Sequence, residues 1–141
     1  MKDQNCAYCM KNELLDKFGY LAFETNCSLV IVFKDQSHKG RMIVAHKNHI
    51  SEIQYLNDEE RNEYLADVAK VAKAIQKVYN PDKINYGAYG DTGCHLHFHL
   101  VPKYKDGFEW GSTFVMNTGN LVSNEECAII AEEIKNAFYS L

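Results

Sequence analysis

Three histidines alternate with large apolar residues between His95 and Val101, in the order His-Leu-His-Phe-His-Leu-Val. Successive side chains of a β-strand point to opposite faces, so this pattern predicts a strand with one apolar face and one histidine face. Same-face neighbours on a strand lie roughly 6.5–7 Å apart, which lets adjacent imidazoles serve one small centre. Imidazole can act as nucleophile, acid, base or metal ligand near neutral pH, so this segment is a candidate reaction centre.

A Cys-x-x-Cys pair, Cys6 and Cys9, lies near the start of the chain. Two cysteines need two more ligands to make a zinc site, and the six histidines of the chain could supply them. A redox function is less well supported, because no βαβ unit follows the pair. The residues alone leave zinc binding and two ordinary reduced thiols equally open.

The alternating segment resembles the signature of the histidine-triad (HIT) nucleotide-binding family, which is His-φ-His-φ-His-φ-φ with φ apolar. It matches at every position, and the similarity extends from the Cys6/Cys9 pair to at least Pro102. The resemblance implies that the middle histidine, His97, attacks the α-phosphorus of a nucleotide and forms a nucleotidyl-histidine intermediate. It also implies that His99 hydrogen-bonds the phosphate oxygens as charge shifts during the reaction.

The same resemblance implies three further nucleotide contacts. Thr92 matches the Ser/Thr that bonds the bridge of the scissile bond, and Asn85 matches a position near the ribose and phosphate. Asp35 matches the residue that accepts the ribose hydroxyls, although a plain turn aspartate is an equally good interpretation. Many members have Gln in place of Asp91 and His in place of Arg41, which leaves the leaving-group preference open.

Family branches with a Cys-x-x-Cys pair use the first triad histidine as a zinc ligand. The resemblance therefore implies a zinc site of Cys6, Cys9, His49 and His95. Four protein ligands make a closed tetrahedron with no position for water, so this zinc would be structural. No organic cofactor is expected.

The fold class predicted is α+β, with a mainly antiparallel five-stranded sheet, helices on one side and a HIT-like architecture. A long helix should begin after Asn57, with Glu60 completing a capping box, and end at Asn80-Pro81; a final helix should begin after Ser123. The apolar stripe of the helix that begins after Asn57 includes Leu65, and the charges of this helix, Asp67 among them, are interpreted as a solvated face. The expected strands cover 19–24, 28–33, 41–45, 83–89 and the histidine segment, and a short helix covers 12–17.

Bulk properties limit the possible partners. The 141 residues predict a single domain, 1–141, and the net charge of −4 without a basic tract argues against nucleic-acid polymers as partners. No apolar run approaches the roughly 20 residues that span a bilayer. The beginning of the sequence does not read as a secretory signal, so a cytoplasmic location is expected. The odd number of cysteines, five, argues against a disulfide framework.

The expected function is a nucleotidyl hydrolase or transferase that acts on nucleoside phosphoramidates or dinucleoside polyphosphates, as a homodimer. A second hypothesis is a zinc-dependent hydrolase in which His95 and His97 both bind a catalytic metal. A third is a nucleotide-binding scaffold protein with little turnover. His38 and His46 are interpreted as solvated surface histidines under all three.

Overall fold

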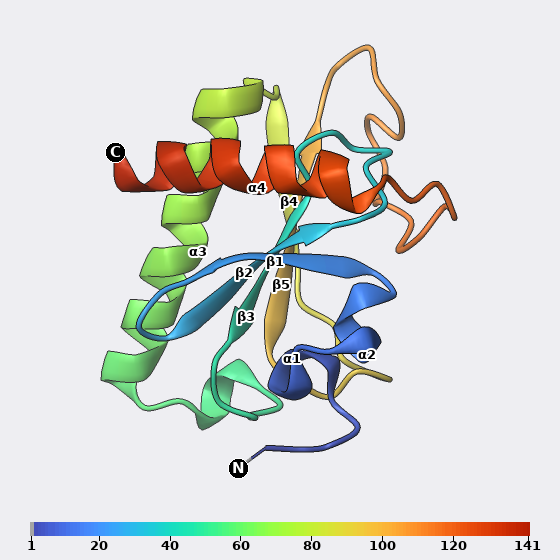
Figure 1. Ribbon diagram of the computed structural model, residues 1–141. Coiled ribbons are helices and arrows are strands. Elements are labelled where there is room, and N and C mark those ends of the chain that lie inside the picture. The colour runs from blue at the N-terminus through green and yellow to red at the C-terminus, as the bar shows by residue number, and fades with distance from the viewer. Residues whose placement is uncertain (1) are drawn as a thin grey trace.

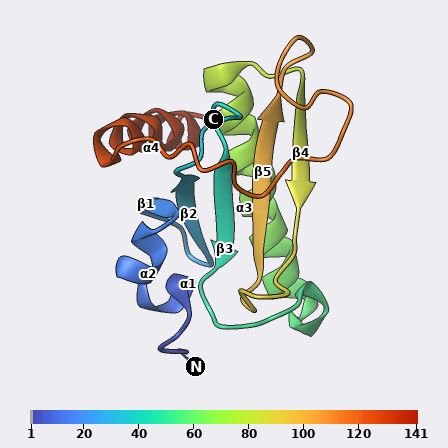
Figure 2. The same cartoon turned by 90° about the vertical axis from the view of Figure 1, so that its right-hand side faces the viewer.

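The computed structural model describes residues 2–141, and its centre is a five-stranded sheet (Figure 1). The strand order is β1-β2-β3-β5-β4, and every neighbouring pair is antiparallel (Figure 2). The predicted fold class is thereby confirmed. The strands are β1 (Gly19–Glu24), β2 (Ser28–Phe33), β3 (Met42–His46), β4 (Lys83–Gly87) and β5 (His97–Lys103).

Two long helices begin at the predicted caps. Asn57 accepts a hydrogen bond from the backbone N–H of Glu60, whose side chain accepts one in return, so the capping box is present. The Ser123 hydroxyl accepts a hydrogen bond from the N–H of Glu126 in the same way. The helices are α1 (Ala7–Met10), α2 (Glu13–Asp16), a 3₁₀ turn η1 (Ile53–Tyr55), α3 (Asp58–Tyr79) and α4 (Asn124–Tyr139).

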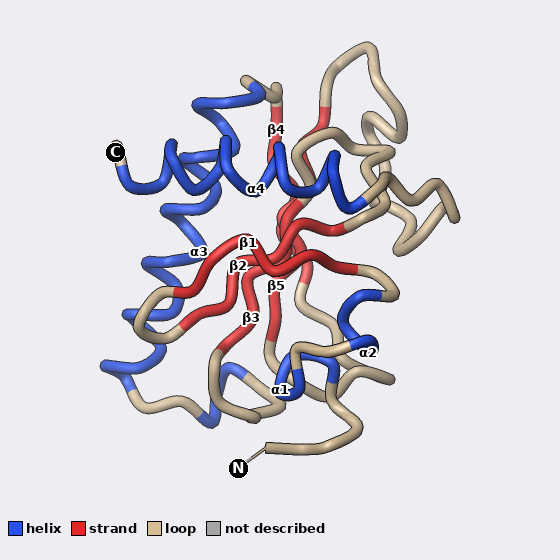
Figure 3. Tube along the Cα trace, in the orientation of Figure 1, coloured by secondary structure: helices blue, strands red, loops and turns tan. Residues whose placement is uncertain are grey.

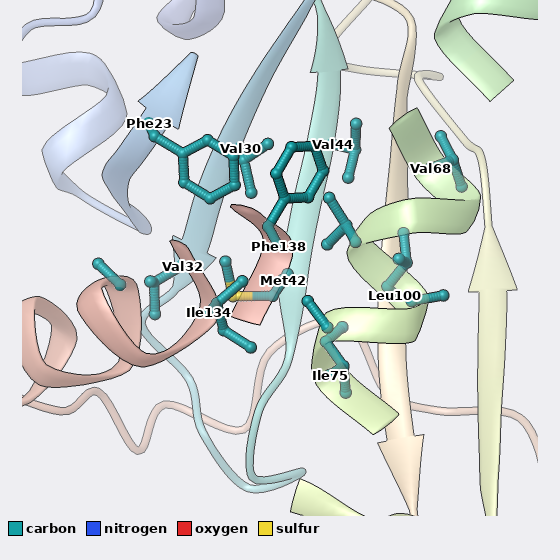
Figure 4. Packing of buried hydrophobic residues seen from close by; sticks show 14 of the residues in the cluster. Phe23, Val30, Val32, Met42, Val44, Val68, Ile75, Leu100, Ile134 and Phe138 are labelled. Carbon is teal, nitrogen blue, oxygen red and sulfur yellow. The ribbon is translucent and has the colours of Figure 1, made fainter. Parts of the chain in front are cut away.

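The long helices α3 and α4 cover one face of the sheet and bury the main hydrophobic core (Figure 4). Leu96, Phe98 and Leu100 point to this face, as the alternation predicts. The core residues labelled in the figure come from β1 to β3, β5 and both helices; they are Phe23, Val30, Val32, Met42, Val44, Val68, Ile75, Leu100, Ile134 and Phe138.

The opposite face of the sheet is only partly covered. Tyr8 of α1 and Leu15 of α2 pack there against the second face of β2 and β3, in a smaller cluster with Ile31 and Ile43. The histidine face of β5 lies on this side, beside β3. The strand itself begins at His97, so His95 precedes it and the predicted strand was two residues too long at this end.

A long connection from Tyr104 to Val122 joins β5 to α4 and folds back over the end of the sheet (Figure 3). It is held at its far end, where the Val122 N–H donates to the carbonyl of Lys34 and Leu121 forms a β-bridge with Asp35. This connection therefore approaches the histidine face, although its sequence gave no indication of that.

Two histidine predictions were wrong. His38 is 3% exposed and His46 is 2% exposed, so neither is a solvated surface residue. His38 Nε2 lies 2.6 Å from a carboxylate oxygen of Glu109, and the ring of His46 packs edge-on against Tyr64. Leu65 of the predicted apolar stripe is exposed, and Tyr64 takes the buried position instead.

None of the helices in the described part of the chain is long and apolar enough to cross a membrane.

β1 and β4 form the two edges of the sheet, and Tyr86 on β4 is half exposed. An open edge strand can pair with a second copy. Homodimer formation stays a prediction.

Asp67 on α3 is a packing residue, contrary to its interpretation as part of a solvated face. One of its carboxylate oxygens accepts hydrogen bonds from the hydroxyls of Thr25 (2.5 Å) and Ser28 (2.7 Å) and from the thiol of Cys27 (3.2 Å). These contacts tie the β1–β2 turn to the helix.

We expect Asp67→Ala to lower the free energy of unfolding by about 2 kcal/mol, because it leaves several donors without their charged acceptor. Urea denaturation measures this change. Lys73→Ala, at an exposed position of the same helix, is the matched control and should change stability by less than about 0.5 kcal/mol. Equal effects of the two substitutions would contradict the proposed tie.

Candidate active site and metal site

A cavity of about 730 Å³ opens over the histidine face of the sheet. His97 and His99 line it from β5, and Tyr8 lines it from α1. The turn before β5 supplies one wall, from Tyr89 to Cys94. Its volume lies within the range typical of small-molecule sites, so the cavity is a candidate active site.

The geometry of His97 fixes which ring nitrogen is free. Nδ1 lies 2.6 Å from the carbonyl oxygen of His95, and a carbonyl can only accept, so Nδ1 carries the proton and donates. Burial lowers the pKa of His97 below its usual value, so the neutral form prevails at neutral pH. Nε2 then keeps its lone pair, and the residue lines the cavity. This is the state that a nucleophilic imidazole requires.

His99 has the opposite arrangement. Its Nδ1 lies 3.1 Å from a terminal nitrogen of Arg41, a guanidinium that is 2% exposed. Burial, the charge of Arg41 and the neighbouring His97 together lower the pKa of His99 to about 3. Two neutral imidazoles therefore lie side by side at the cavity, with ring centroids 5.2 Å apart.

The structure brings some of the predicted nucleotide-binding residues to the cavity and leaves others outside. Thr92 lines it and is exposed, and Asp91 lies next to it on the same wall. Asn85 pairs with Val101 across β4 and β5, which puts its side chain on the histidine face but not in the cavity lining.

Asp35 is not in the cavity lining. It is 1% exposed, and its two carboxylate oxygens accept hydrogen bonds from the backbone and side chain of Ser37 and of Thr118. Burial by itself raises the pKa of this carboxyl, but these hydrogen bonds outweigh it and lower the pKa to about 2. The interpretation of Asp35 as a turn residue fits this environment, and a ribose contact does not.

The four predicted metal ligands form a compact cluster. The ligand atoms of Cys6, Cys9, His49 and His95 all lie within 4.8 Å of one another. Nδ1 of His95 is 3.2 Å from Nδ1 of His49 and 3.3 Å from Sγ of Cys6. A zinc tetrahedron with bonds of about 2.0–2.3 Å has edges of roughly 3.3–3.8 Å, so these spacings suit a single ion.

The hydrogen bonding of His95 supports this fit. Nε2 lies 2.6 Å from the carbonyl oxygen of His46 and must therefore donate to it, which leaves Nδ1 unprotonated and directed at the cysteines. Burial, the leading cause, lowers the pKa of His95 to about 4, so the ring is neutral at neutral pH. A neutral imidazole with a fixed second hydrogen bond is the usual form of a histidine metal ligand.

Two parts of the site were missed by the sequence interpretation. Arg41 is buried directly against His99, although its only sequence signal was its departure from the histidine common in the family. The Tyr104–Val122 connection contributes Met116 and Asn117 to the cavity wall. No pattern in that polar segment indicated a contact with the histidine strand.

Comparison with known proteins gives the family. The model of the HIT domain matches residues 20–106, which is more than half of the chain. The protein therefore belongs to the HIT domain family.

Individual relatives agree with this assignment. The chain is 28% identical over 120 residues to adenosine 5'-monophosphoramidase hnt1 of Schizosaccharomyces pombe, covering 80% of this chain and 84% of the relative. A histidine-triad protein of Sinorhizobium meliloti has the same fold, with a TM-score of 0.81, 20% identity and coverage of 89% and 94%. A zinc-bound histidine-triad family protein of Mycobacterium smegmatis superposes with a TM-score of 0.66, 16% identity and coverage of 96% and 94%.

We expect Asp35→Asn to loosen the Tyr104–Val122 connection without impairing nucleotide binding. The folded pKa of about 2 lies below the ordinary value of 3.8, so the ionised carboxylate stabilises the fold above about pH 4. That contribution, about 2 kcal/mol, is lost as the pH falls toward 2. Denaturation between pH 2 and 7 should show this loss in the wild type and less of it in Asp35→Asn.

Asp106→Asn, at an exposed position of the same connection, is the control and should leave the pH dependence unchanged. A drop in nucleotide affinity of tenfold or more in Asp35→Asn, with stability unaltered, would instead support the ribose contact.

Proposed function

We propose that this protein is a nucleotidyl hydrolase or transferase that cleaves at the α-phosphate through a nucleotidyl-histidine intermediate. The observation that carries the proposal is the fixed tautomer of His97, whose Nδ1 donates to the His95 carbonyl while the ring lines the cavity. A neutral, oriented imidazole with a free Nε2 is a competent nucleophile toward phosphorus.

The proposed reaction has two steps. In the first, the Nε2 lone pair of His97 forms a bond to the α-phosphorus while the bond to the leaving amine or phosphate breaks, and a leaving amine takes a proton from solvent. In the second, a water oxygen attacks the phosphorus, the N–P bond breaks, and the water releases a proton. The products are a nucleoside monophosphate and the leaving group, and His97 returns to its starting state.

Other cavity residues have supporting roles in this proposal. His99 hydrogen-bonds the non-bridging oxygens, where charge increases as the phosphoryl group is transferred. Thr92, which is exposed and lines the same cavity as His97, bonds the bridging atom of the scissile bond. Asn85 lies on the histidine face of β4 outside the cavity lining, so its contact with the nucleotide stays a prediction.

We propose that the Cys6, Cys9, His49 and His95 cluster binds one structural zinc ion. The support is the spacing of the four donor atoms and the mixed thiol and imidazole set, which is typical of closed zinc sites. Bound zinc would tie the N-terminal segment to the residue that precedes β5. It has no step in the reaction.

The competing hypotheses are less well supported. A catalytic metal held by His95 and His97 would need a free nitrogen on His95, but Nε2 bonds the His46 carbonyl and Nδ1 lies among the cysteines. A binding scaffold with little turnover differs from the main proposal only in rate, so an assay must separate them.

Phosphoramidates are the first substrates to test, because one relative is named as an adenosine 5'-monophosphoramidase. A cytoplasmic location stays a prediction.

His97→Ala should reduce turnover of adenosine phosphoramidate to less than a few per cent of wild type, because it removes the nucleophile. Nucleotide affinity should change by no more than about tenfold, which corresponds to roughly 1.4 kcal/mol of lost contact. The kinetics of wild type and variant should be measured with and without a chelator, and with a dinucleoside polyphosphate as second substrate.

His38→Gln removes a buried imidazole that lies outside the cavity and serves as the matched control. Turnover by His97→Ala close to that of His38→Gln would remove His97 from the nucleophile role. Binding without turnover in the wild type would favour the scaffold hypothesis, and turnover lost with the chelator would favour the metal-dependent one.

Freshly purified protein should contain about one zinc per chain, as a single four-ligand site requires. Cys9→Ser should lose the metal and thermal stability, whereas His97→Ala and His99→Ala should retain it. Acidification should release zinc, since thiolates and neutral imidazoles take up protons in competition with the ion. Elemental analysis together with thermal denaturation measures these effects.

Cys94→Ser is the control for this experiment, since Cys94 is an exposed cysteine directly before His95. It should keep the full zinc content. Wild-type protein that contains no zinc, although never exposed to a chelator, would show that Cys6 and Cys9 are ordinary thiols.

A further inference from the structure

We propose that Arg41 is a positioning residue that fixes the tautomer of His99, so that His99 presents an Nε2–H donor to the phosphate group in the cavity. The inference rests on the proposed function and deepens it, because it identifies how the phosphate oxygens are bound. Within residues 2–141, Arg41 is a buried charged residue in direct contact with His99.

The direction of the contact follows from the chemistry of the two groups. A terminal guanidinium nitrogen of Arg41 lies 3.1 Å from Nδ1 of His99. Guanidinium has donors and no acceptor, so Nδ1 of His99 must accept. In a neutral imidazole the single proton is then on Nε2. A histidine at position 41 could donate or accept, whereas arginine allows only one tautomer of its partner.

The proton on His99 Nε2 is available to a ligand. His99 lines the cavity, and no group in the described part of the chain hydrogen-bonds its Nε2. Within residues 2–141, the side-chain nitrogen and oxygen atoms that are both fully buried and without a partner are Arg41 Nε and the Tyr79 hydroxyl. His99 Nε2 is not among them and therefore faces accessible space.

The guanidinium is held in place by groups that do not neutralise it. Its carbon lies 4.1 Å from the ring centre of Phe33 and 5.0 Å from that of Phe114. One nitrogen donates to the carbonyl of Val115, and another lies 3.6 Å from Sδ of Met116. No carboxylate oxygen in the described chain lies within 4 Å of it.

Arg41 stays charged despite its burial. Desolvation lowers its pKa to about 10, which is still well above neutral pH, and the carboxylates of Asp35 and Glu109 act on it only at longer range. The positive charge disfavours protonation of His99 and leaves it a neutral donor. The same charge favours an anion in the cavity, since no carboxylate oxygen of residues 2–141 lies within 4 Å of it; the carboxylates of Asp3 and Asp91 on the cavity lining act against this effect.

Nuclear magnetic resonance of ¹⁵N-histidine-labelled protein tests the tautomer directly, with His99 assigned from the signal lost in His99→Asn. Long-range ¹H–¹⁵N correlations at neutral pH should show the Nε2–H form in the wild type. Arg41→Met, which removes the donor and keeps an apolar side chain of similar length, should give a mixture of tautomers. Arg41→Lys, whose ammonium also only donates, should retain more of the Nε2–H form than Arg41→Met.

Glu109→Gln is the control for indirect effects. Glu109 accepts from the N–H of Val115 and so supports the same connection, but it does not touch His99. This variant should keep the wild-type tautomer. A tautomer shift as large as that of Arg41→Met would assign the effect to the connection and overturn the inference.

Kinetics with adenosine phosphoramidate supply the second readout. Arg41→Met should lower kcat roughly 10- to 100-fold, with KM affected less, because the lost donor acts mainly on the transition state. In a His99→Asn background, Arg41→Met should cost less than about threefold, since its route of action is already gone. An undiminished loss in that background would overturn the positioning role.

The failure of this inference differs from the failure of the proposed function. Wild-type protein with its proton on Nδ1 of His99, or a tautomer unchanged in both Arg41 variants, overturns the role of Arg41 whatever the turnover. Absence of turnover on all nucleotide probes overturns the proposed function, and the tautomer measurement still decides the role of Arg41.

Discussion

One hydrogen bond, from Nδ1 of His97 to the carbonyl oxygen of His95, connects the cavity with the cluster of cysteines and histidines around His95. It fixes the tautomer of the imidazole at the cavity, and its acceptor belongs to the backbone of a residue whose side chain lies among the cysteines. The position of that carbonyl depends on how His95 is anchored, through the His46 carbonyl on one side and contacts with Cys6, Cys9 and His49 on the other. The anchoring of His95 therefore affects the tautomer and the orientation of His97.

The electrostatics of the cavity follow from burial. His97 and His99 have lowered pKa values because desolvation penalises their charged forms, so both are neutral at neutral pH. The nearby positive charge is that of Arg41, which is buried between two phenylalanine rings. The chain as a whole carries a net charge of −4. The positive charge beside this cavity is therefore local and opposite in sign to the net charge of the protein.

The predictions for His38 and Asp67 failed for the same physical reason. Both have polar side chains in segments that are typical of turns or helix surface, where solvation is the usual outcome. Each is instead paired with a group distant in sequence: Glu109 for His38 and the β1–β2 turn for Asp67. A buried polar group is stable only when such a partner is present, and local sequence does not contain the partner.

The strands, to within two residues at their ends, could be predicted from the sequence, as could the caps of the long helices and the two faces of β5, because these depend on side-chain period and on contacts within a few residues. The sequence also predicted the Cys6, Cys9, His49 and His95 cluster, through resemblance to a family whose motif it matches. Only the tertiary structure shows which nitrogen is free on His95 and on His99, since their partners, the His46 carbonyl and Arg41, are distant in sequence. It also decided that Arg41 lies against His99 under the Tyr104–Val122 connection. That contact depends on the path of a segment without periodic pattern, which only long-range packing determines.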